Sequence, residues 1–409
     1  MKKRVAVLGA SGSIGKSALE VIALGKNDFE IVLLSSHSRE KELAELGRQW
    51  PAAKTVLSGA QNGREALLAA IADCGADIAL NGISGAAGLE PSMAAIESGA
   101  NLALANKETL VMAGPLVFQK AREKKVDIIP VDSEHAAVFH LLEAHGRCPR
   151  SKNFTTENTE FHGERDNDIS KLRVAPCTPW SNILLRQPYD NLEEIILTAS
   201  GGPFRNYSIE EMKNVSPQEA LAHPTWNMGA KITIDSASMA NKGLEVIEAA
   251  QLFNLAPEKI KVAIHPQSIV HSMIRMKDGA VYAQLSRPDM RLPIHQALHW
   301  PQTVPANEFG RLEFDSLTLE FCQPDTQKFP LLGLAYEAAK KGGLYPCAYN
   351  AANEAGAAAF LGGRIGFLDI GRITGYVLDK DWSGEPADIA SVMEADRQAR
   401  IMAEKETEC

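Results

Sequence analysis

The stretch Val5-Ala6-Val7-Leu8-Gly9-Ala10-Ser11-Gly12-Ser13-Ile14-Gly15 decides the fold of the N-terminal part of the chain. Four consecutive apolar residues predict a buried strand, and three glycines follow it directly. A helical pattern then runs from Ser17 to Leu24. Glycines between a strand and a helix allow a tight turn and the close approach of a diphosphate, whose charge is met by the helix N-terminus. This pattern favours dinucleotide binding, with a ligand-free glycine-rich turn as the alternative.

Short apolar runs alternate with helical patterns through residues 1–131. The expected strands cover residues 5–8, 31–34, 77–80, 102–105 and 127–129, and the expected crossover helices include 17–24, 64–72 and 91–98. Strands that are apolar on both faces are typical of a parallel sheet covered by helices. We therefore predict an α/β fold that begins with a Rossmann-like nucleotide-binding domain.

The rest of the chain has a different pattern. Mixed elements, namely a helix over 136–144, a strand over 195–198 and an apolar run over 262–264, predict an α+β catalytic domain over residues 132–299. A connecting segment over 300–325 leads to helical patterns at 330–341, 350–361 and 389–403, which predict a C-terminal helical bundle over 326–409. Residues 145–188 are polar and carry seven basic and five acidic residues, so we expect an exposed or partly disordered insertion there.

Composition excludes several classes of protein. The 409 residues include 42 basic and 51 acidic side chains, and the net charge of −9 disfavours a nucleic-acid partner. Six cysteines are dispersed without a CxxC pair, so we expect cytosolic thiols rather than disulfides or a zinc site. The chain contains no apolar run long enough to span a membrane. We expect a cytoplasmic protein with no membrane association.

The end of the second expected strand distinguishes NADP from NAD. An acidic residue usually meets the ribose 2′-hydroxyl of NAD at this point, whereas this chain has Ser35-Ser36-His37-Ser38-Arg39. Hydroxyl and cationic groups suit the 2′-phosphate of NADP. We predict NADP, with Arg39 and Ser38 as the main contacts, and keep a solvated turn as the alternative.

A phosphate-hydrolysing enzyme is a rival hypothesis. Residues 10–17 read ASGSIGKS, which differs from a P-loop only because Ala10 replaces its first glycine. In such an enzyme Asp132, at the end of a strand, is a candidate Mg²⁺ ligand.

Carboxylates and phosphate-binding side chains gather in two later motifs. Asp132 and Glu134 follow the last N-terminal strand, where two carboxylates can converge on a hard cation such as Mg²⁺ or Mn²⁺, although a solvated turn is the alternative. Glu245 is a candidate third ligand, and a helix from about Ser238 would place Asn241 on the same face. Lys242, Ser236 and Ser200 add donors that suit a phosphate monoester. The alternatives are a helix cap for Ser236 and a surface salt bridge between Lys242 and Glu245.

The motif His223-Pro224-Thr225-Trp226-Asn227-Met228-Gly229 suits a hinged flap that closes over a substrate. Trp226 is equally suited to a hydrophobic core.

These motifs together resemble the 1-deoxy-D-xylulose 5-phosphate reductoisomerase family of the non-mevalonate isoprenoid pathway. The resembling stretches are LGASGSIG at 8–15, ANKETL at 105–110, VDSEH at 131–135, TASGGPFR at 198–205, HPTWNMG at 223–229, residues 235–245, HPQSIVHSMI at 265–274, PDMRLPI at 288–294 and NAANE at 350–354. The resemblance runs nearly end to end and excludes the P-loop hypothesis. It implies an NADPH- and metal-dependent isomerisation and reduction that gives 2-C-methyl-D-erythritol 4-phosphate.

The resemblance also implies a role for each matching residue. Asp132, Glu134 and Glu245 look like ligands of Mg²⁺ or Mn²⁺, with Co²⁺ as a further candidate. The implied substrate contacts are Lys107, Ser133 and Glu134 at the hydroxyl and carbonyl end, and Ser200, Ser236, Asn241, Lys242 and His223 at the phosphate. The implied catalytic residues are Lys107, Glu134, His223 and Glu245. The cofactor contacts are Ser11, Gly12, Ser13, Ile14, Asn106, Glu108 and Gly229, with His37, Ser38 and Arg39 added from the strand end.

Two further expectations follow from the resemblance. The family is homodimeric, which implies a homodimer here. The chain departs from the family pattern at residues 145–188, which lengthen one connection by roughly 30 residues. The competing hypothesis is an NADP-dependent binding protein that has lost its chemistry to this insertion, but the metal carboxylates and Lys107 are retained and favour an enzyme.

Overall fold

The N-terminal part of the chain is built on a six-stranded sheet with the order β3-β2-β1-β4-β5-β6. A computed structural model describes residues 1–146, 189, 191–223, 225, 226 and 228–408. The strands of this sheet are β1 (Lys3–Leu8), β2 (Phe29–Ser36), β3 (Lys54–Leu57), β4 (Ile78–Asn81), β5 (Asn101–Leu104) and β6 (Ile128–Pro130). Every pair in the sheet is parallel, so the carboxyl ends of the strands share one edge. The order reverses between β1 and β4, and ligands of such sheets bind in the crevice at that point.

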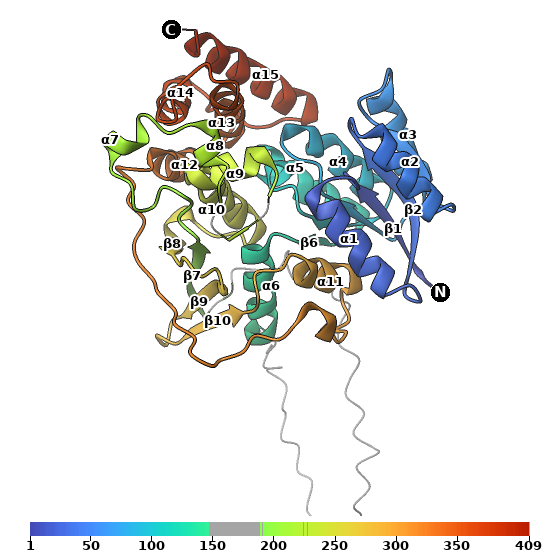
Figure 1. Cartoon of the computed structure of the whole chain (residues 1–409). Coiled ribbons are helices and arrows are strands. Elements are labelled where there is room, and N and C mark those ends of the chain that lie inside the picture. The colour runs from blue at the N-terminus through green and yellow to red at the C-terminus, as the bar shows by residue number, and fades with distance from the viewer. Residues whose placement is uncertain (147–188, 190, 224, 227, 409) are drawn as a thin grey trace, which may run out of the picture.

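Helices pack against this sheet, as Figure 1 shows. They are α1 (Ser13–Leu24), α2 (Glu40–Gln49), α3 (Gly63–Asp73), α4 (Leu89–Glu97) and α5 (Glu108–Lys124), with a 3-10 turn η1 (Ala86–Gly88) before α4. Val5 to Leu8 of β1 are all buried, so both faces of the sheet centre are covered. The predicted Rossmann-like α/β fold is confirmed. Sequence patterns missed β3 because only Val56 of this short edge strand is buried.

A second, four-stranded sheet has the order β10-β9-β7-β8. Its strands are β7 (Leu192–Ala199), β8 (Ile260–Ile264), β9 (Val270–Met276) and β10 (Val281–Leu285), and its only parallel pair among the described strands is β7 with β8. The surrounding helices are α6 (Ser133–Gly146), α7 (Ile209–Met212), α8 (Pro217–Ala220), α9 (Ala230–Ala237), α10 (Ala240–Leu252) and α11 (Arg291–His299). This mixture of strands and helices matches the predicted α+β character.

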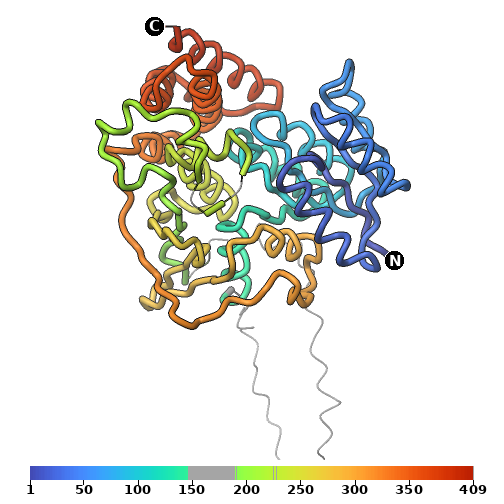
Figure 2. The backbone as a smooth tube through the Cα atoms, viewed as in Figure 1, coloured from blue at the N-terminus to red at the C-terminus, as the bar shows by residue number. Residues whose placement is uncertain are grey.

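The C-terminal part is helical. It contains α12 (Pro330–Lys341), α13 (Tyr345–Leu361), α14 (Asp369–Leu378) and α15 (Ile389–Glu406). Residues 300–325 run along the outside of the molecule from α11 to α12 and are orange in Figure 2. Helix α13 is rich in alanine and largely buried, and it packs against α14 and α15 as well as against α5 and α9. The predicted helical C-terminal region is therefore confirmed, and its central helix contacts the other two parts of the molecule.

The structure confirms one local prediction and leaves others open. The helix expected from about Ser238 is α10, which begins at Ala240, and Met239, with a φ of 63°, separates it from α9. The insertion expected at residues 145–188 lies almost entirely outside the described residues, and the domain boundaries at 131, 299 and 325 stay predictions. Among the described helices, none is long and apolar enough to cross a membrane. Cys74, Cys322 and Cys347 are free thiols.

Candidate active site

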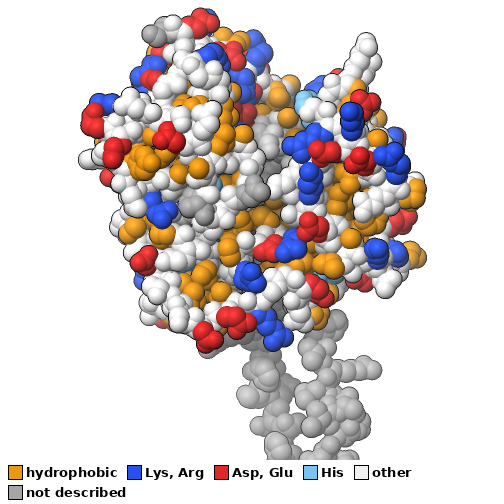
Figure 3. Space-filling view, viewed as in Figure 1, with side chains coloured by type: hydrophobic (Ala, Val, Ile, Leu, Met, Phe, Trp, Pro, Cys, Tyr) orange, Lys and Arg blue, Asp and Glu red, His pale blue; other side chains and the backbone are white. Residues whose placement is uncertain are grey.

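A cavity of about 400 Å³ lies at the carboxyl edge of the six-stranded sheet. Figure 3 shows the surface hollowed between the N-terminal part and the C-terminal helices. Most of the predicted site residues line this cavity: Gly12, Ser13, Ile14, Arg39, Lys107, Glu108, Asp132, Ser133, Glu134, Ser200, His223, Gly229, Ser236, Asn241, Lys242 and Glu245. Four predicted residues, Ser11, His37, Ser38 and Asn106, lie outside its lining.

The turn between β1 and α1 brings backbone close to the cavity. Gly9 has a φ of 80°, and a Cβ on Gly15 would lie 2.3 Å from the Gly9 carbonyl oxygen, so both positions require glycine. The Gly12 N–H donates to the Gly9 carbonyl oxygen, and no side chain caps the first turn of α1, so the backbone N–H groups that begin at Ser13 are left for a phosphate.

The end of β2 supports the glycine turn. The Ser11 and Ser36 hydroxyl oxygens are 2.6 Å apart, and Nη1 of Arg39 donates to the Ser11 carbonyl oxygen at 2.8 Å. Arg39 also lines the cavity, so its guanidinium can reach the 2′-phosphate of a bound NADP. His37 and Ser38 are exposed beside it. Of the three residues predicted here, Arg39 is thus the one that the fold directs into the cavity.

Asn106 is buried and acts on the segment after β4. Its Nδ2 donates to the carbonyl oxygens of Ile83 at 2.7 Å and Gly85 at 3.0 Å, and to Oε2 of Glu108 at 2.9 Å. Ile83 and Ser84 line the cavity, although no sequence motif pointed to them. Asn106 therefore shapes the cavity wall through its neighbours.

Three carboxylates and two ammonium groups meet at the floor of the cavity. Oxygens of Asp132, Glu134 and Glu245 all lie within 4.8 Å of one another. Nζ of Lys107 lies 2.5 Å from Oδ2 of Asp132 and 3.2 Å from Oε1 of Glu245, and Nζ of Lys242 lies 2.7 Å from Oε1 of Glu134 and also contacts Glu245. These ion pairs are largely buried, so the alternative of a surface salt bridge between Lys242 and Glu245 is wrong.

Burial and charge set the protonation states in this cluster. Burial alone would raise the pKa of Asp132, but the Lys107 ammonium holds it well below its usual range. The pKa of Lys107 is raised well above its usual value, because Asp132 and Glu245 outweigh the opposing effect of burial. Burial, with the neighbouring Glu245 carboxylate, raises the pKa of Glu134 to about 7. Lys107 and Asp132 are therefore a stable ion pair at neutral pH.

His135 and Glu248 lie behind Asp132 and were missed as site residues. Nδ1 of His135 lies 3.3 Å from Oε2 of Glu248 and 3.8 Å from Oδ1 of Asp132. Burial opposes protonation of His135, but Glu248 and Asp132 raise its pKa to about 9. The spacing of Glu245 and Glu248 on one helix face was the only sequence signal for this pair.

Donors for a phosphate line the cavity next to the carboxylate cluster. Ser200 follows β7, Ser236 lies on α9, and Asn241 and Lys242 lie on α10. Asn241 donates to Oε1 of Glu245 at 2.6 Å, which confirms that these residues share one helix face. Ser236 lies near the end of α9, so the alternative that it caps a helix is wrong.

His223 connects Ser200 to the loop that contains Trp226. Its Nδ1 accepts from the backbone N–H groups of Thr225 at 3.1 Å and Trp226 at 2.9 Å. The hydrogen of a neutral imidazole is then on Nε2, which donates to the Ser200 hydroxyl at 3.0 Å. Burial and the nearby Arg205 lower the pKa of His223, which favours the neutral form. Trp226 is half-buried in the cavity wall, so the alternative of a core residue is wrong.

Comparison with known families decides which enzymes share this site. A model described as 1-deoxy-D-xylulose 5-phosphate reductoisomerase matches residues 5–62 and 53–114, and its C-terminal domain model matches residues 128–253. A model described as the DXP reductoisomerase C-terminal domain matches residues 285–402. The chain belongs to the 1-deoxy-D-xylulose 5-phosphate reductoisomerase family.

Individual members of the reductoisomerase family agree over the whole chain. The protein from Treponema denticola is 43% identical, over 98% of this chain and 96% of that protein. The protein from Pelodictyon phaeoclathratiforme is 42% identical, over 98% of this chain and 99% of that protein. The solved Zymomonas mobilis reductoisomerase in complex with NADPH is 37% identical with a TM-score of 0.82, over 100% of this chain and 99% of that chain. A reductoisomerase complex with NADPH, fosmidomycin and magnesium is 34% identical with a TM-score of 0.84, over 99% and 98%.

Membership of the reductoisomerase family confirms the resemblance and removes the phosphate-hydrolysing alternative. Sequence reasoning missed a second set of charged groups at the cavity wall, centred on Lys231. The spacing of Lys231 and Asp235 on one helix face was available as a signal, but their partner Glu354 lies far away in the sequence.

Proposed function

We propose that this chain converts 1-deoxy-D-xylulose 5-phosphate into 2-C-methyl-D-erythritol 4-phosphate, with NADPH as reductant and a divalent metal, in the isoprenoid pathway of its family. The observation that carries the proposal is one cavity that joins the glycine turn of a Rossmann-like sheet to a cluster of three carboxylates and two lysines. A phosphorylated substrate that is both rearranged and reduced needs these parts in a single site.

The donor set at the cavity floor suits a hard divalent cation. Asp132, Glu134 and Glu245 offer oxygen atoms that already lie close together, and Mg²⁺ and Mn²⁺ prefer such ligands, with Co²⁺ as a further candidate. These three residues would hold the ion. The bound ion would polarise the substrate ketone and acidify a neighbouring hydroxyl.

The two lysines supply the remaining positive charge. Lys107 stays protonated between Asp132 and Glu245, so its ammonium can donate to a substrate oxygen that gains negative charge. Ser133 and Glu134 lie beside it for the hydroxyl and carbonyl end of the substrate. Lys242 lies on the next helix turn from Glu245, where its charge favours a phosphate dianion.

The phosphate and the cofactor occupy opposite sides of the cavity in this proposal. Ser200, Ser236, Asn241 and His223 would hold the phosphate together with Lys242. The cofactor would lie along the glycine turn, with contacts from Gly12, Ser13, Ile14, Arg39, Glu108 and Gly229 and with Ser11, His37, Ser38 and Asn106 nearby. The Trp226 loop would exclude water between them.

A spectrophotometric assay tests the proposal. We expect loss of NADPH absorbance with 1-deoxy-D-xylulose 5-phosphate that requires Mg²⁺ or Mn²⁺ and stops when a chelator is added. NADPH binding without any turnover would favour the alternative, an NADP-dependent binding protein, and would contradict the enzyme proposal.

We also infer a homodimer that acts in the cytoplasm. Support for the dimer is β10, an edge strand among the described strands, on which Val281 and Tyr282 are exposed. Sedimentation velocity of the full chain at micromolar concentration tests this, and a monomer at all concentrations would contradict it.

A further inference from the structure

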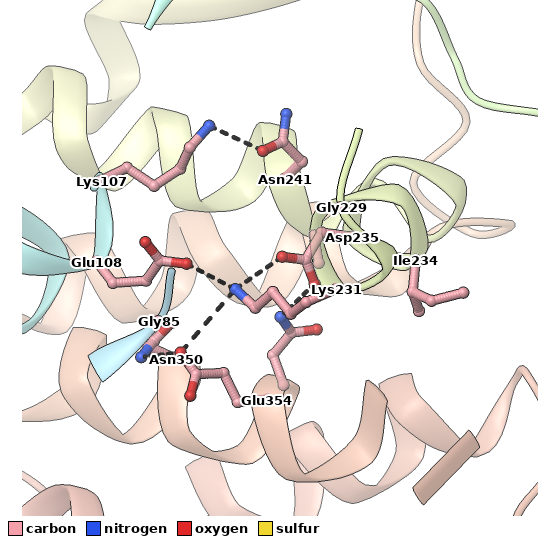
Figure 4. A network of polar contacts seen from close by, with 12 residues as sticks. Gly85, Lys107, Glu108, Gly229, Lys231, Ile234, Asp235, Asn241, Asn350 and Glu354 are labelled. Atoms are coloured by element: carbon pink, nitrogen blue, oxygen red, sulfur yellow. Dashed lines mark hydrogen bonds and ion pairs between the residues drawn. The ribbon is translucent and has the colours of Figure 1, made fainter. Parts of the chain in front are cut away.

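Lys231 is a half-buried cation at a position where a helix disfavours positive charge. It is the second residue of α9, and the N-terminus of a helix carries the positive end of its dipole. Nζ of Lys231 lies 2.8 Å from Oε1 of Glu108, 2.8 Å from Oδ2 of Asp235 and 4.0 Å from Oε1 of Glu354 (Figure 4). The carboxylates raise its pKa although burial opposes this, so Lys231 stays charged.

The three carboxylates come from three separate parts of the molecule. Glu108 begins α5 at the carboxyl edge of the six-stranded sheet, and Asp235 lies one turn further along α9. Glu354 lies on α13 in the C-terminal helical region. One ammonium group therefore ties α9 to the cofactor side of the cavity and to the C-terminal helices.

Each carboxylate also accepts hydrogen bonds from further groups. Glu108 accepts from Asn106, and Asp235 accepts from Nδ2 of Asn353 at 2.8 Å. Glu354 accepts from the backbone N–H of Ala86 at 3.2 Å and from Nη2 of Arg400 at 3.0 Å. Ala86 begins η1, and only Gly85 separates it from the segment of residues 82–84 that lines the cavity.

Helix α9 carries predicted ligand contacts at both of its ends. Gly229 precedes it at the end of the Trp226 loop, and Ser236 follows Asp235 directly near its C-terminus. A displacement of α9 relative to α5 would move the predicted phosphate group Ser236 and the predicted cofactor contact Gly229 together. Lys107 and Glu245 lie on other elements, Lys107 directly before α5 and Glu245 on α10.

We propose that Lys231 is a positioning residue that sets α9 against α5 and α13 and thereby aligns the phosphate side of the cavity with its cofactor side. This inference rests on the proposed function for the identity of the two ligands. Lys231 acts through Glu108 and Asp235, and it takes no part in the chemical step.

The test begins with Lys231→Met, because methionine has a side chain of similar length to lysine but carries no charge. We expect KM for 1-deoxy-D-xylulose 5-phosphate to rise by about tenfold and the NADPH dissociation constant, measured by fluorescence titration, to rise by about fivefold or more. We expect kcat to change much less, because Lys107 and the metal carboxylates are unaltered. The matched control Lys213→Met removes an exposed lysine that pairs with the exposed Glu210, and it should leave every value unchanged.

A double variant separates positioning from stability. Lys231→Met alone leaves Glu108 and Asp235 buried without their shared cation, and the melting temperature should fall. Lys231→Met with Asp235→Asn removes one of these two unpaired charges, so the melting temperature should recover in part while KM and the NADPH dissociation constant stay raised. Lys231→Arg keeps the charge and should restore most of the NADPH affinity.

Two outcomes would overturn the inference. If KM and NADPH affinity return to wild-type values together with the melting temperature, Lys231 only stabilises the fold. If kcat falls while both affinities are unchanged, Lys231 does not position α9. A wild-type protein that binds NADPH without turnover would refute the proposed function alone, and the NADPH titrations of the variants would still decide the role of Lys231.

Discussion

Nζ of Lys107 lies 2.5 Å from Oδ2 of Asp132, although the two residues follow different strands. Lys107 comes shortly after β5 and Asp132 shortly after β6, and these strands are parallel neighbours. Their carboxyl ends therefore meet at one edge of the sheet. Glu245 reaches the same point from α10 and contacts Lys107 at 3.2 Å, so one carboxylate connects the sheet edge to the second part of the molecule.

Glu245→Gln should abolish most of the turnover and leave NADPH affinity nearly intact. The amide has the shape of the carboxylate but lacks the charge that a divalent metal requires, and Lys107 and Lys242 lose a shared partner. We expect kcat/KM to fall by at least about 100-fold. The exposed Glu210→Gln is the control of the same shape and should behave as wild type. A collapse of NADPH affinity in fluorescence titrations would show that Glu245 is misassigned.

Arg39→Ala should weaken the preference for NADPH over NADH. Arg39 lines the cavity and is anchored on the Ser11 carbonyl oxygen, where a guanidinium can meet a 2′-phosphate. We expect kcat/KM with NADPH to fall by about tenfold and kcat/KM with NADH to stay unchanged. Arg48→Ala, on the exposed end of α2, is the control. An equal loss for both cofactors would contradict a 2′-phosphate contact.

Gly15→Ala should damage the glycine turn. The added Cβ would lie 2.3 Å from the Gly9 carbonyl oxygen and 2.5 Å from Cα of Ala10, and backbone cannot rotate away as a side chain can. We expect a loss of about 1–3 kcal/mol in the free energy of unfolding, together with loss of NADPH binding. Gly333→Ala in α12 meets nothing within 4 Å and should stabilise the protein by about 0.5–1 kcal/mol. Urea denaturation and NADPH titration measure both effects, and intact NADPH binding in Gly15→Ala would count against this turn as the cofactor site.

His271 should make the protein less stable as the pH falls. Burial lowers the pKa of His271 from 6.5 to about 4, and its Nε2 lies 2.9 Å from the Ser286 hydroxyl. Between these two pKa values the unfolded chain binds a proton that the folded chain does not. Above pH 6.5, His271 is neutral in both states and does not affect the free energy of unfolding. As the pH falls from 6.5 to about 4, His271 lowers the free energy of unfolding by about 1.4 kcal/mol per pH unit.

The comparison of wild type with His271→Asn tests this pH dependence. Between pH 6.5 and about 4, the urea midpoint of the variant should fall less steeply with falling pH than that of wild type. The difference in slope should correspond to the uptake of one proton on unfolding. His140→Asn, at a partly exposed position on α6, should keep the wild-type slope. Parallel slopes for wild type and His271→Asn would show that His271 is protonated in the folded state at these pH values.

Local patterns in the sequence determined the parts of this protein whose causes are local. A strand followed by glycines predicts a dinucleotide turn because the steric requirement of Gly9 and Gly15 lies within that turn. The strand ends that carry Lys107 and Asp132 could be found for the same reason, since parallel strands bring their carboxyl ends to one edge. The contact between Asn241 and Glu245 could be predicted because residues four apart lie on the same face of a helix.

Only the tertiary structure decided how the charged groups are paired. Lys231 meets Glu354 across 123 positions of sequence, and His135 meets Glu248 across 113, because packing of α13 on α9 and of α6 near α10 brings them together. Burial then decides their charge: in water these groups would titrate independently, whereas here each ion requires a partner to offset its lost solvation. No periodicity in the sequence specifies which distant element supplies that partner.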